Sequence, residues 1–296
     1  MTISIKNLSV VIVSFHSQEV IDDCIKSISN EIQIIVVENS RNKTVKSTLE
    51  SKYKNVKCIL PSENLGMGAG NNFGLTFVQT DFAFILNPDV TLEKNTIEEI
   101  ISASKNLEIF GLIAPISSNS TYPNYKIFKK NNSSINKKAP FRVESVDGFA
   151  MILNIKKLKQ LEHFRENNFF DENFFMYLEN DDLCKRINNN NYKIFIVPTS
   201  KINHLGGKAV SKKYKEQIEL SRNWHWMWSK FYFNKKHKGF MIAFLNNFPT
   251  FLSAVLKFFL YSILNHKKKY VYYHRASGFL NALLCKKSYH RPKINN

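Results

Sequence analysis

The first third of the chain alternates short apolar runs with segments of helical periodicity, and this alternation constrains the fold most. Continuous β-branched runs of this kind are typical of strands buried on both faces of a parallel sheet. The predicted strands are Leu8–Val13, Gln33–Val37, Val56–Leu60 and Phe82–Leu86. The predicted helices are Val20–Ile28, Thr44–Tyr53, Gly70–Val78 and Thr96–Ser104. The order predicts an α/β fold with a mostly parallel, right-handed sheet.

The pattern is less regular farther along. Residues Ser117–Pro140 are polar and rich in Asn, Ser and Lys, which predicts a surface loop. Strand character returns at Gly148–Leu153 and at Tyr192–Val197, where Pro198 is expected to end the strand. Between them, Phe174–Arg186 is interpreted as a loop that enters a helix.

The charge of the chain is concentrated in its last third. The 296 residues carry 42 Lys and Arg against 24 Asp and Glu, a net charge of +18. Residues 1–204 hold 24 basic and 22 acidic side chains, whereas residues 205–296 hold 18 and 2. We therefore divide the chain into an α/β domain over 1–207 and a basic helical region over 208–296.

Cysteine usage and the N-terminus favour a cytoplasmic protein. The cysteines Cys24, Cys58, Cys184 and Cys285 lie far apart and form no CxxC pair, which fits a reducing compartment and argues against a structural zinc site. The apolar run at Leu8–Phe15 is short, is interrupted by serines and lacks a cleavage site, so we do not expect a signal peptide.

Polar side chains follow all four predicted strands. Ligands of open α/β sheets bind at the carboxyl ends of the strands. Such residues also suit turns for backbone reasons, and a solvated loop acid is an equally good interpretation of Glu38 alone. The segments that follow the strands start with Ser14-Phe15 after the first, Glu38-Asn39 after the second, Asn64 after the third and Asn87 after the fourth.

A glycine-rich segment follows the third strand. Gly66, Gly68 and Gly70 precede a predicted helix, where backbone amides can approach a phosphate, and Asn71 follows them. A dinucleotide-binding loop is the alternative, but such a loop normally follows the first strand, and the GxGxxG spacing is absent.

Asp89 lies directly beyond the fourth strand. A hard divalent cation needs few protein oxygens where substrate phosphates supply the rest, so one such carboxylate is enough. The alternative is a Pro-Asp turn without a ligand. His204, expected opposite Asp89 in the sheet, is a candidate second metal ligand or phosphate contact, although a lone histidine is more often structural.

Three acids lie within four residues at Glu179, Asp181 and Asp182. Like charges at this distance raise at least one pKa, which suits a general base that works near neutrality. The alternative is an acidic helix start, with Asn180 or Asp181 as the cap.

In this order, the motifs VVIVSFHS, IIVVENS, ENLGMGAGNN, FILNPDV, VDGFAMIL, FFMYLENDDLCKR and INHLGG resemble glycosyltransferase family 2. The resemblance covers about residues 7–235 and is strongest to the bacterial rhamnosyltransferase-type branch. It implies a Rossmann-like GT-A fold and an inverting, metal-dependent transfer of a sugar from a nucleotide-diphosphate donor.

The resemblance also implies roles for single residues. Ser14, Glu38 and Asn64 with the glycine loop would contact the donor, while Asp89 would hold most of an Mg²⁺ or Mn²⁺ ion, with His204 near the metal or the diphosphate. Asp147 and Gly148 would belong to the acceptor side. The family's frequent base position is Asn180 here, which leaves Glu179 or Asp181, of which we favour Glu179.

The basic region contains a strongly apolar stretch at Phe240–Leu264 that is interrupted by polar residues. A spanning helix needs about 20 continuous apolar residues. We therefore expect helices lying on the cytoplasmic face of an anionic membrane, near a lipid-linked saccharide acceptor. The alternatives are a helical subdomain packed on the catalytic domain, a nucleic-acid-binding protein, and a catalytically inactive scaffold.

Overall fold

The computed structural model describes residues 2–107, 109–119, 123–128, 138–162, 164 and 168–292. The chain forms two compact units. The first unit comprises residues 1–65, 69–171 and 180–211, and the second comprises residues 66–68, 172–179 and 212–296.

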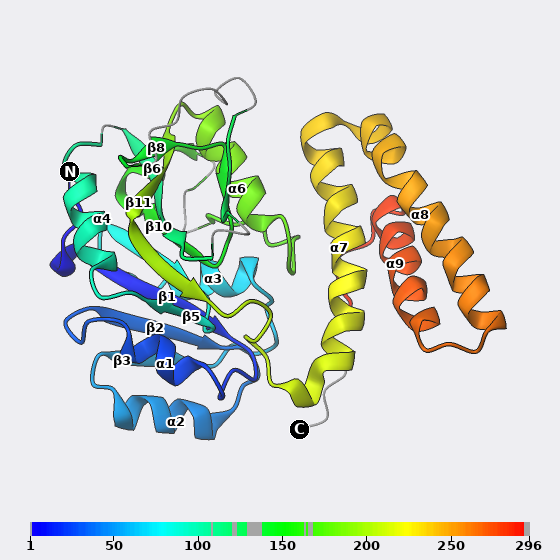
Figure 1. Ribbon diagram of the computed structural model, residues 1–296, viewed down its shortest axis with the longest axis horizontal. Coiled ribbons are helices and arrows are strands. Elements are labelled where there is room, and N and C mark those ends of the chain that lie inside the picture. The colour runs from blue at the N-terminus through cyan, green and yellow to red at the C-terminus, as the bar shows by residue number, and fades with distance from the viewer. Residues whose placement is uncertain are drawn as a thin grey trace. The chain divides into compact units, whose positions relative to one another are not determined.

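The first unit is built on a twisted sheet with the strand order β3-β2-β1-β4-β10-β6-β11-β5 (Figure 1). Its first four strands are parallel, as the alternating sequence predicts, and they are β1 (Leu8–Ser14), β2 (Gln33–Glu38), β3 (Val56–Ile59) and β4 (Phe82–Leu86). Parallel strands with short connections end at the same edge, so the residues that follow β1, β2 and β4 meet there.

The second half of the sheet mixes strand directions. The strand β10 (Ala150–Asn154) runs antiparallel to β4 and to β6 (Phe110–Ser117). The strand β11 (Lys193–His204) is parallel to β6 and carries the antiparallel β5 (Val90–Leu92) at the edge. Three two-residue strands complete the set: β7 (Tyr125–Lys126) pairs with β9 (Ser145–Val146), and β8 (Phe141–Arg142) pairs with β11.

The apolar runs are continuous because both faces of the sheet are covered. Val10 and Ile12 of β1 pack in one cluster with Ile25 of the first helix, whereas Val11 packs on the other face with Leu75 and Leu183. The helices that accompany this sheet are α1 (Ile21–Lys26), α2 (Lys43–Lys52), α3 (Gly68–Leu75), α4 (Thr96–Ser104), α5 (Ile155–Leu158) and α6 (Glu179–Asn189), with a 3₁₀ turn η1 (Ile5–Asn7) before β1.

Two sequence-based expectations differ from the structure. Pro198 does not end its strand, because β11 continues to His204 through a register shift between Val197 and Lys201. An irregularity of this kind accommodates a residue without a backbone N–H. The predicted loop over 117–140 contains the short strand β7 among its described residues. Residues 120–122 and 129–137 of this predicted loop lie outside the described ranges.

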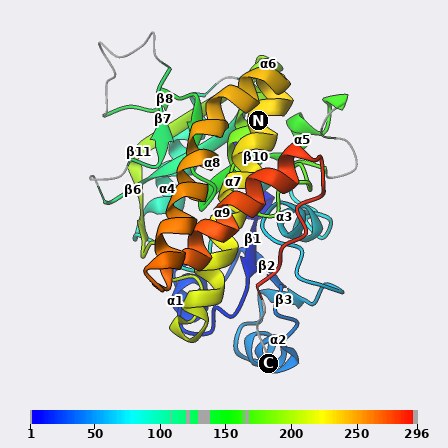
Figure 2. The same cartoon turned by 90° about the vertical axis from the view of Figure 1, so that its right-hand side faces the viewer.

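The second unit contains three long helices that pack against one another (Figure 2), and a short 3₁₀ turn, η4 (Lys212–Tyr214), precedes them. They are α7 (Lys215–Lys238), α8 (Phe240–Ile263) and α9 (Lys268–Leu283). Gly239, with φ of +86°, separates α7 from α8. A side chain at Gly278 would place its Cβ 2.2 Å from the Trp224 carbonyl oxygen, so α7 and α9 cross at a distance that only glycine permits.

The helix α8 is long and apolar enough to cross a membrane by length and composition, with only 17% of its most apolar window buried. The small core of the unit instead gathers around Trp224, Phe231 and Phe279. Ala243 of α8 belongs to this core, and Phe244 and Phe251 pack against it.

Candidate active site

Polar side chains from three neighbouring strand ends meet at the carboxyl edge of the first unit. Ser14 at the end of β1 lies opposite Glu38 at the end of β2 in the strand register. The Asn39 amide donates to the Ser14 carbonyl oxygen at 2.8 Å. Because β4 lies on the other side of β1, Asn87 and Asp89 follow the same edge. The sequence-based expectation that these strand ends converge is confirmed.

Glu38 is a buried carboxylate with hydroxyl donors on both sides. The hydroxyls of Ser14 and Ser40 donate to Oε2 and Oε1 of Glu38, and the Ser40 amide donates to Oε1 at 2.9 Å. Burial raises the pKa of Glu38, and these hydrogen bonds oppose that increase. A solvated loop acid is therefore the wrong interpretation of Glu38. The half-buried Phe15 follows Ser14 and packs edge-on against His16, whose φ of +50° reverses the chain beyond β1.

The glycines after β3 have packing reasons of their own. A Cβ on Gly70 would lie 3.1 Å from a Val13 methyl group and 3.4 Å from the Asn39 amide nitrogen. Gly66 has φ of +76°, and a Cβ there would overlap the Phe175 backbone within the second unit. Asn64 lies in the connection before them. Next to Gly70, the Asn71 side chain is buried and its Oδ1 has no hydrogen-bond partner, which makes it the polar group of this segment best placed to receive a ligand.

The segment Asn87-Pro88-Asp89 forms the turn that its composition suggests, since the Val90 amide donates to the Asn87 carbonyl oxygen at 3.2 Å. Asn87 is also held by its own amide, which donates to the Phe149 carbonyl oxygen at 2.9 Å. Asp89 is nevertheless only 2% exposed, and its Oδ1 has no hydrogen-bond partner. Burying a carboxylate oxygen in this state is costly unless a cation or a ligand donor compensates for it.

His204 is the group that faces this carboxylate. It pairs with Val90 at the end of β11, and its Nε2 lies 3.5 Å from Asp89 Oδ1. Its ring stacks on Phe149 with centroids 4.0 Å apart, which fixes its orientation. The predicted placement of His204 opposite Asp89 is confirmed.

The pair fits a divalent cation by its donor chemistry. A carboxylate oxygen and an imidazole nitrogen suit Mn²⁺, and Mg²⁺ accepts the carboxylate with other ligands from substrate phosphates and water. Within the described ranges, no group of three or more His, Cys, Asp or Glu side chains forms a self-sufficient metal site. A cation here would therefore share its coordination with a bound ligand.

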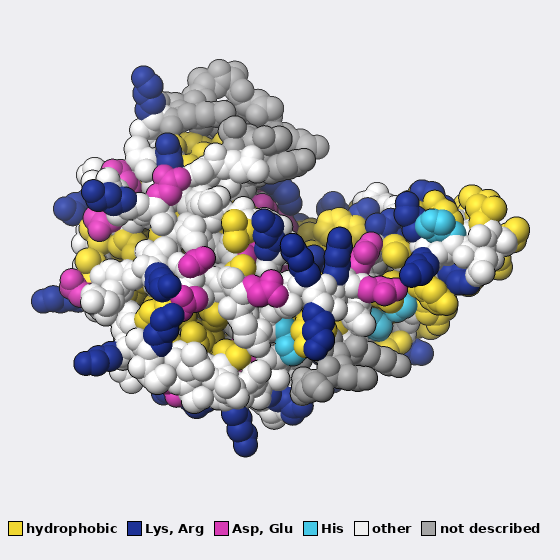
Figure 3. Space-filling view, turned by 60° about the horizontal axis from the view of Figure 1, so that its bottom comes forward, with side chains coloured by type: hydrophobic (Ala, Val, Ile, Leu, Met, Phe, Trp, Pro, Cys, Tyr) yellow, Lys and Arg dark blue, Asp and Glu magenta, His cyan; other side chains and the backbone are white. Residues whose placement is uncertain are grey.

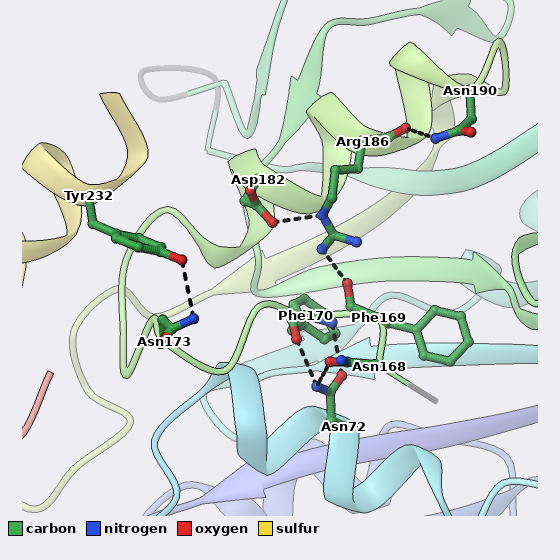
Figure 4. A network of polar contacts seen from close by, with 9 residues as sticks. All are labelled: Asn72, Asn168, Phe169, Phe170, Asn173, Asp182, Arg186, Asn190 and Tyr232. Atoms are coloured by element: carbon green, nitrogen blue, oxygen red, sulfur yellow. Dashed lines mark hydrogen bonds and ion pairs between the residues drawn. The ribbon is translucent and has the colours of Figure 1, made fainter. Parts of the chain in front are cut away.

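The acidic segment places its side chains in separate environments. Asp181 accepts from Lys126 Nζ at 2.6 Å and from Ser145 Oγ at 3.2 Å. Asp182 is fully buried and is paired with Arg186 at 2.8 Å, and Arg186 also donates to the Phe169 carbonyl oxygen (Figure 4). Two of the three predicted catalytic acids are thus each bound to a basic side chain.

Asn180, which lies between the predicted acids Glu179 and Asp181, has a structural contact. Its Nδ2 donates to the Val146 carbonyl oxygen at 2.8 Å. A Cβ on Gly148 would lie 3.2 Å from the Asn180 Cβ, so Gly148 allows this close approach of α6 to the turn before β10. The amide therefore joins the start of α6 to the predicted acceptor-side segment.

Asp147 lies in that segment. Its side chain is exposed to solvent, yet desolvation by the surrounding protein, followed by the Asp181 charge, raises its pKa, while Lys126 and His204 oppose this. The charges of Asp147, Asp181, Lys126 and His204 therefore act on one another, and the structure brings the predicted acceptor-side and metal residues into one electrostatic neighbourhood.

Glu179 is the first residue of α6 and is buried. It ends the segment 172–179, which belongs to the second unit and is held to α7 there by several contacts. Asn173 donates to the Tyr232 hydroxyl at 3.2 Å (Figure 4), Ser229 donates to the Met176 carbonyl oxygen at 2.9 Å, and Phe175 stacks on His225.

The backbone before Glu179 is strained. Tyr177 and Leu178 have φ of +70° and +66°, a conformation that costs of order 1–3 kcal/mol for a non-glycine residue. Burial raises the Tyr177 pKa, Arg222 opposes this, and the Glu179 charge adds to it, so these three side chains share one neighbourhood. Strain of this kind concentrates at functional sites, where the surrounding structure maintains it.

Several residues of this region were not singled out by the sequence. Phe149 holds the His204 ring, Lys126 binds Asp181, and Arg222 lies near Tyr177 and Glu179. Phe149 lies inside the VDGFAMIL motif, whereas Lys126 and Arg222 lie in segments that carry no local signal.

Comparisons with known proteins agree with this architecture. The hexosyltransferase Agl10 of low-salt glycan biosynthesis from Haloferax volcanii is 23% identical over 209 residues, and the match covers 64% of each chain. The chain thus matches less than two thirds of the length of this curated relative.

Solved structures show the same fold. The mannosyltransferase PcManGT from Pyrobaculum calidifontis, in complex with GDP-Man and Mn²⁺, superposes with a TM-score of 0.54 at 11% identity, covering 95% of this chain and 88% of that one. GalNAc-T7 with UDP, GalNAc and Mn²⁺ superposes with a TM-score of 0.53 at 15% identity, covering 75% and 51%. The fold is GT-A, a mixed α/β fold with a large curled sheet and a helical C-terminal region. Residues 9–161, more than half of the chain, match the profile of glycosyl transferase family 2, and the chain belongs to this family.

Proposed function

We propose that the protein is an inverting glycosyltransferase that moves a hexose from a nucleotide-diphosphate donor to a saccharide hydroxyl. The observation that carries the proposal is the buried Asp89 carboxylate, which faces His204 at the carboxyl edge of a family 2 sheet. Relatives support the donor class: one is a hexosyltransferase, and two structural neighbours are complexes with UDP or GDP-Man and Mn²⁺.

Asp89 and His204 would hold Mn²⁺ or Mg²⁺. When bound, such an ion offsets the negative charge that develops on the departing nucleotide diphosphate. The chain's own part at this edge is to orient the donor. Glu38, kept in place by Ser14 and Ser40, offers acceptor oxygens to the nucleoside, and the buried Asn71 Oδ1 offers another. The backbone of the glycine segment that opens α3 supplies N–H groups.

Glu179 is the proposed general base. Asn180 has no group that titrates near neutrality, while Asp181 and Asp182 are each bound to a basic side chain. A carboxylate at Glu179 would take the proton of the acceptor hydroxyl as the oxygen attacks the anomeric carbon. General-base assistance contributes about 10²–10⁴-fold to such a step.

For the donor we propose a dTDP-rhamnose-like or UDP-linked sugar, and for the acceptor a lipid-linked saccharide of cell-surface polysaccharide or lipopolysaccharide assembly. The donor proposal rests on the resemblance of the motifs to the rhamnosyltransferase-type branch. The acceptor proposal rests on that resemblance and on the composition of the C-terminal helices.

The test is a screen of nucleotide sugars for release of nucleoside diphosphate, with Mn²⁺, with Mg²⁺ and with a chelator. We expect one donor class to be turned over only when a divalent ion is present. Release that is insensitive to chelation would overturn the metal assignment. An absence of release with every donor and every saccharide acceptor would favour the second candidate, an inactive scaffold, which the Asn180 substitution makes possible.

A further inference from the structure

The helix α8 exposes a continuous apolar face in addition to the face that packs inward. Its outward stripe consists of large apolar side chains spaced by four, three, four, four, three and four residues, which keeps them on one helical face. Their exposed fractions run from 38% to 84%. The stripe comprises Met241, Leu245, Phe248, Leu252, Leu256, Phe259 and Ile263.

The inward face of α8 packs on the other two helices through small and aromatic side chains, and Phe251 stacks there on Phe279. Ala243, Asn247 and Ala254 are buried there, and the Asn247 side chain donates within the helix to the Ala243 carbonyl oxygen at 2.6 Å. A surface helix normally directs its apolar face to the core and its polar face to water. Seven large apolar side chains on the outer face therefore require a partner other than water.

We propose that the outward stripe of α8 inserts into the interfacial layer of an anionic lipid bilayer, with α8 parallel to the membrane plane. An amphipathic helix in this position buries its apolar face about 5–10 Å into the boundary between headgroups and acyl chains. Phe248 and Phe259 of the stripe, with Tyr270 and Tyr273 of α9 also exposed, supply the aromatic side chains that suit this layer.

The charges around the stripe match an anionic surface. Lysines lie at both ends of α8, at Lys235, Lys236 and Lys238 before it and at Lys267–Lys269 after it. The sequence contains no Asp or Glu from Leu220 onward. Figure 3 shows basic and hydrophobic side chains together on the surface formed by the three helices. A stripe with basic ends and no acidic residues complements lipid phosphates.

The same charges argue against a second copy of the chain as the partner. A symmetric dimer would bring the stripe and its flanking lysines against their own copies, and like charges across an interface are repulsive. A membrane-spanning arrangement is also disfavoured. One face of α8 packs on α7 and α9, and the exposed Lys257 lies within the helix, with its ammonium 5.5 Å from the Tyr272 ring.

The proposal does not depend on the glycosyl transfer, and its test uses binding alone. The full-length protein is mixed with vesicles of phosphatidylcholine, or of phosphatidylcholine with phosphatidylglycerol, and is separated by flotation. We expect it to float with the anionic vesicles and to remain largely at the bottom with the neutral ones.

Two sets of variants separate the apolar and charged contributions. The triple change Leu245→Ser, Leu252→Ser and Leu256→Ser should reduce partitioning by about tenfold for each side chain that leaves the lipid. Changing Lys267, Lys268 and Lys269 to Gln should reduce it by about fivefold per lysine. The matched control is Ile109→Gln in the first unit, which removes an equally exposed aliphatic side chain and should change nothing.

Because the substituted side chains are exposed, apart from the half-buried Lys269, folding is expected to persist, and an unchanged far-UV circular dichroism spectrum verifies this. Equal flotation of the triple Leu variant and the wild type would overturn the proposal. A dimer that forms without lipid and is dissociated by the triple Leu change, while flotation persists, would also overturn the proposal. A mobility shift with DNA in the absence of flotation would overturn it as well. Membrane-bound protein that resists alkaline carbonate extraction would overturn the orientation parallel to the membrane.

Discussion

The first unit buries carboxylates, whereas the second exposes large apolar side chains. Glu38 and Asp89 lie at strand ends with almost no contact with water, whereas Met241, Leu256 and Ile263 on α8 are 62% to 84% exposed. Both arrangements cost free energy in the isolated protein. The difference is consistent with the two proposals above, a polar ligand at the sheet edge and a lipid surface at α8, and the predictions below test this division.

Substitution of Glu179 is expected to have the largest effect on turnover. It tests whether the catalytic residues all lie in the first unit. The segment that leads to it is anchored on α7 through Asn173, Phe175 and Met176. We expect Glu179→Gln to lower kcat by about 10²–10⁴-fold while the KM for the donor changes little, because only proton transfer is removed.

Steady-state release of nucleoside diphosphate measures this effect, and Glu172→Gln at an exposed position of the same segment is the control. Near-normal turnover of the Glu179 variant would remove it as the base.

The buried Asp182–Arg186 pair tests the stability of the first unit. Arg186→Met leaves Asp182 without its cation at a fully buried position, and breaking such a pair costs about 3–5 kcal/mol. Lys156→Met is the control, because its pair with Asp81 is exposed and is expected to contribute less than about 1 kcal/mol.

The three tryptophans all lie in α7, so fluorescence reports on the second unit during urea unfolding, while hydrogen exchange of the β1 and β4 amides reports on the first. We expect Arg186→Met to weaken protection of the strand amides more than it shifts the fluorescence transition. Equal effects on both probes would show that the two units unfold as one.

Asp89 tests the polar partner of the sheet edge. Asp89→Asn keeps the size of the side chain but removes its charge, and we expect turnover to fall by about 10²–10³-fold, as when one electrostatic contact to the developing charge is lost. Calorimetric titration with Mn²⁺ in the presence of nucleoside diphosphate should show weakened binding, whereas Asp81→Asn should behave as wild type. Unchanged Mn²⁺ binding by the Asp89 variant would contradict the metal assignment.

The sequence predicted the elements with strong local patterns. β4 and α4 have the predicted bounds, and β1 differs by one residue, because an uninterrupted apolar run or a clear helical period decides them. The strand β6 was not predicted, since Gly111 and Pro115 interrupt its apolar pattern, and only its pairing with β10 and β11 makes it a strand.

The site divides in the same way. The convergence of Glu38, Asp89 and His204 could be predicted because each lies at or just beyond the end of a strand, and topology alone brings strand ends together. The contacts of Lys126 with Asp181 and of Phe149 with His204 could not, because they depend on the β7–β9 pair and on the antiparallel insertion of β10. In pairings of this kind, the local sequence around one residue does not indicate which residue it will contact.

The smallest expected effect concerns His225, a buried polar group of the second unit. Its Nε2 lies 2.7 Å from the His290 carbonyl oxygen and its Nδ1 lies 3.0 Å from Ser288 Oγ, so the ring joins α7 to the C-terminal segment. Burial lowers its pKa from 6.5 to about 3. The neutral ring is therefore favoured in the folded state, and its contribution is present above pH 6.5 and is lost as the pH falls toward 3.

Between pH 7 and pH 5 the unfolded chain takes up a proton at this position and the folded chain does not, which should cost about 2 kcal/mol of stability. Tryptophan fluorescence during urea unfolding measures the loss, since Trp224 stacks on His290 beside the ring. His225→Gln should flatten this pH dependence, whereas His266→Gln at an exposed position should preserve it. A slope that survives His225→Gln would assign the pH dependence to other groups.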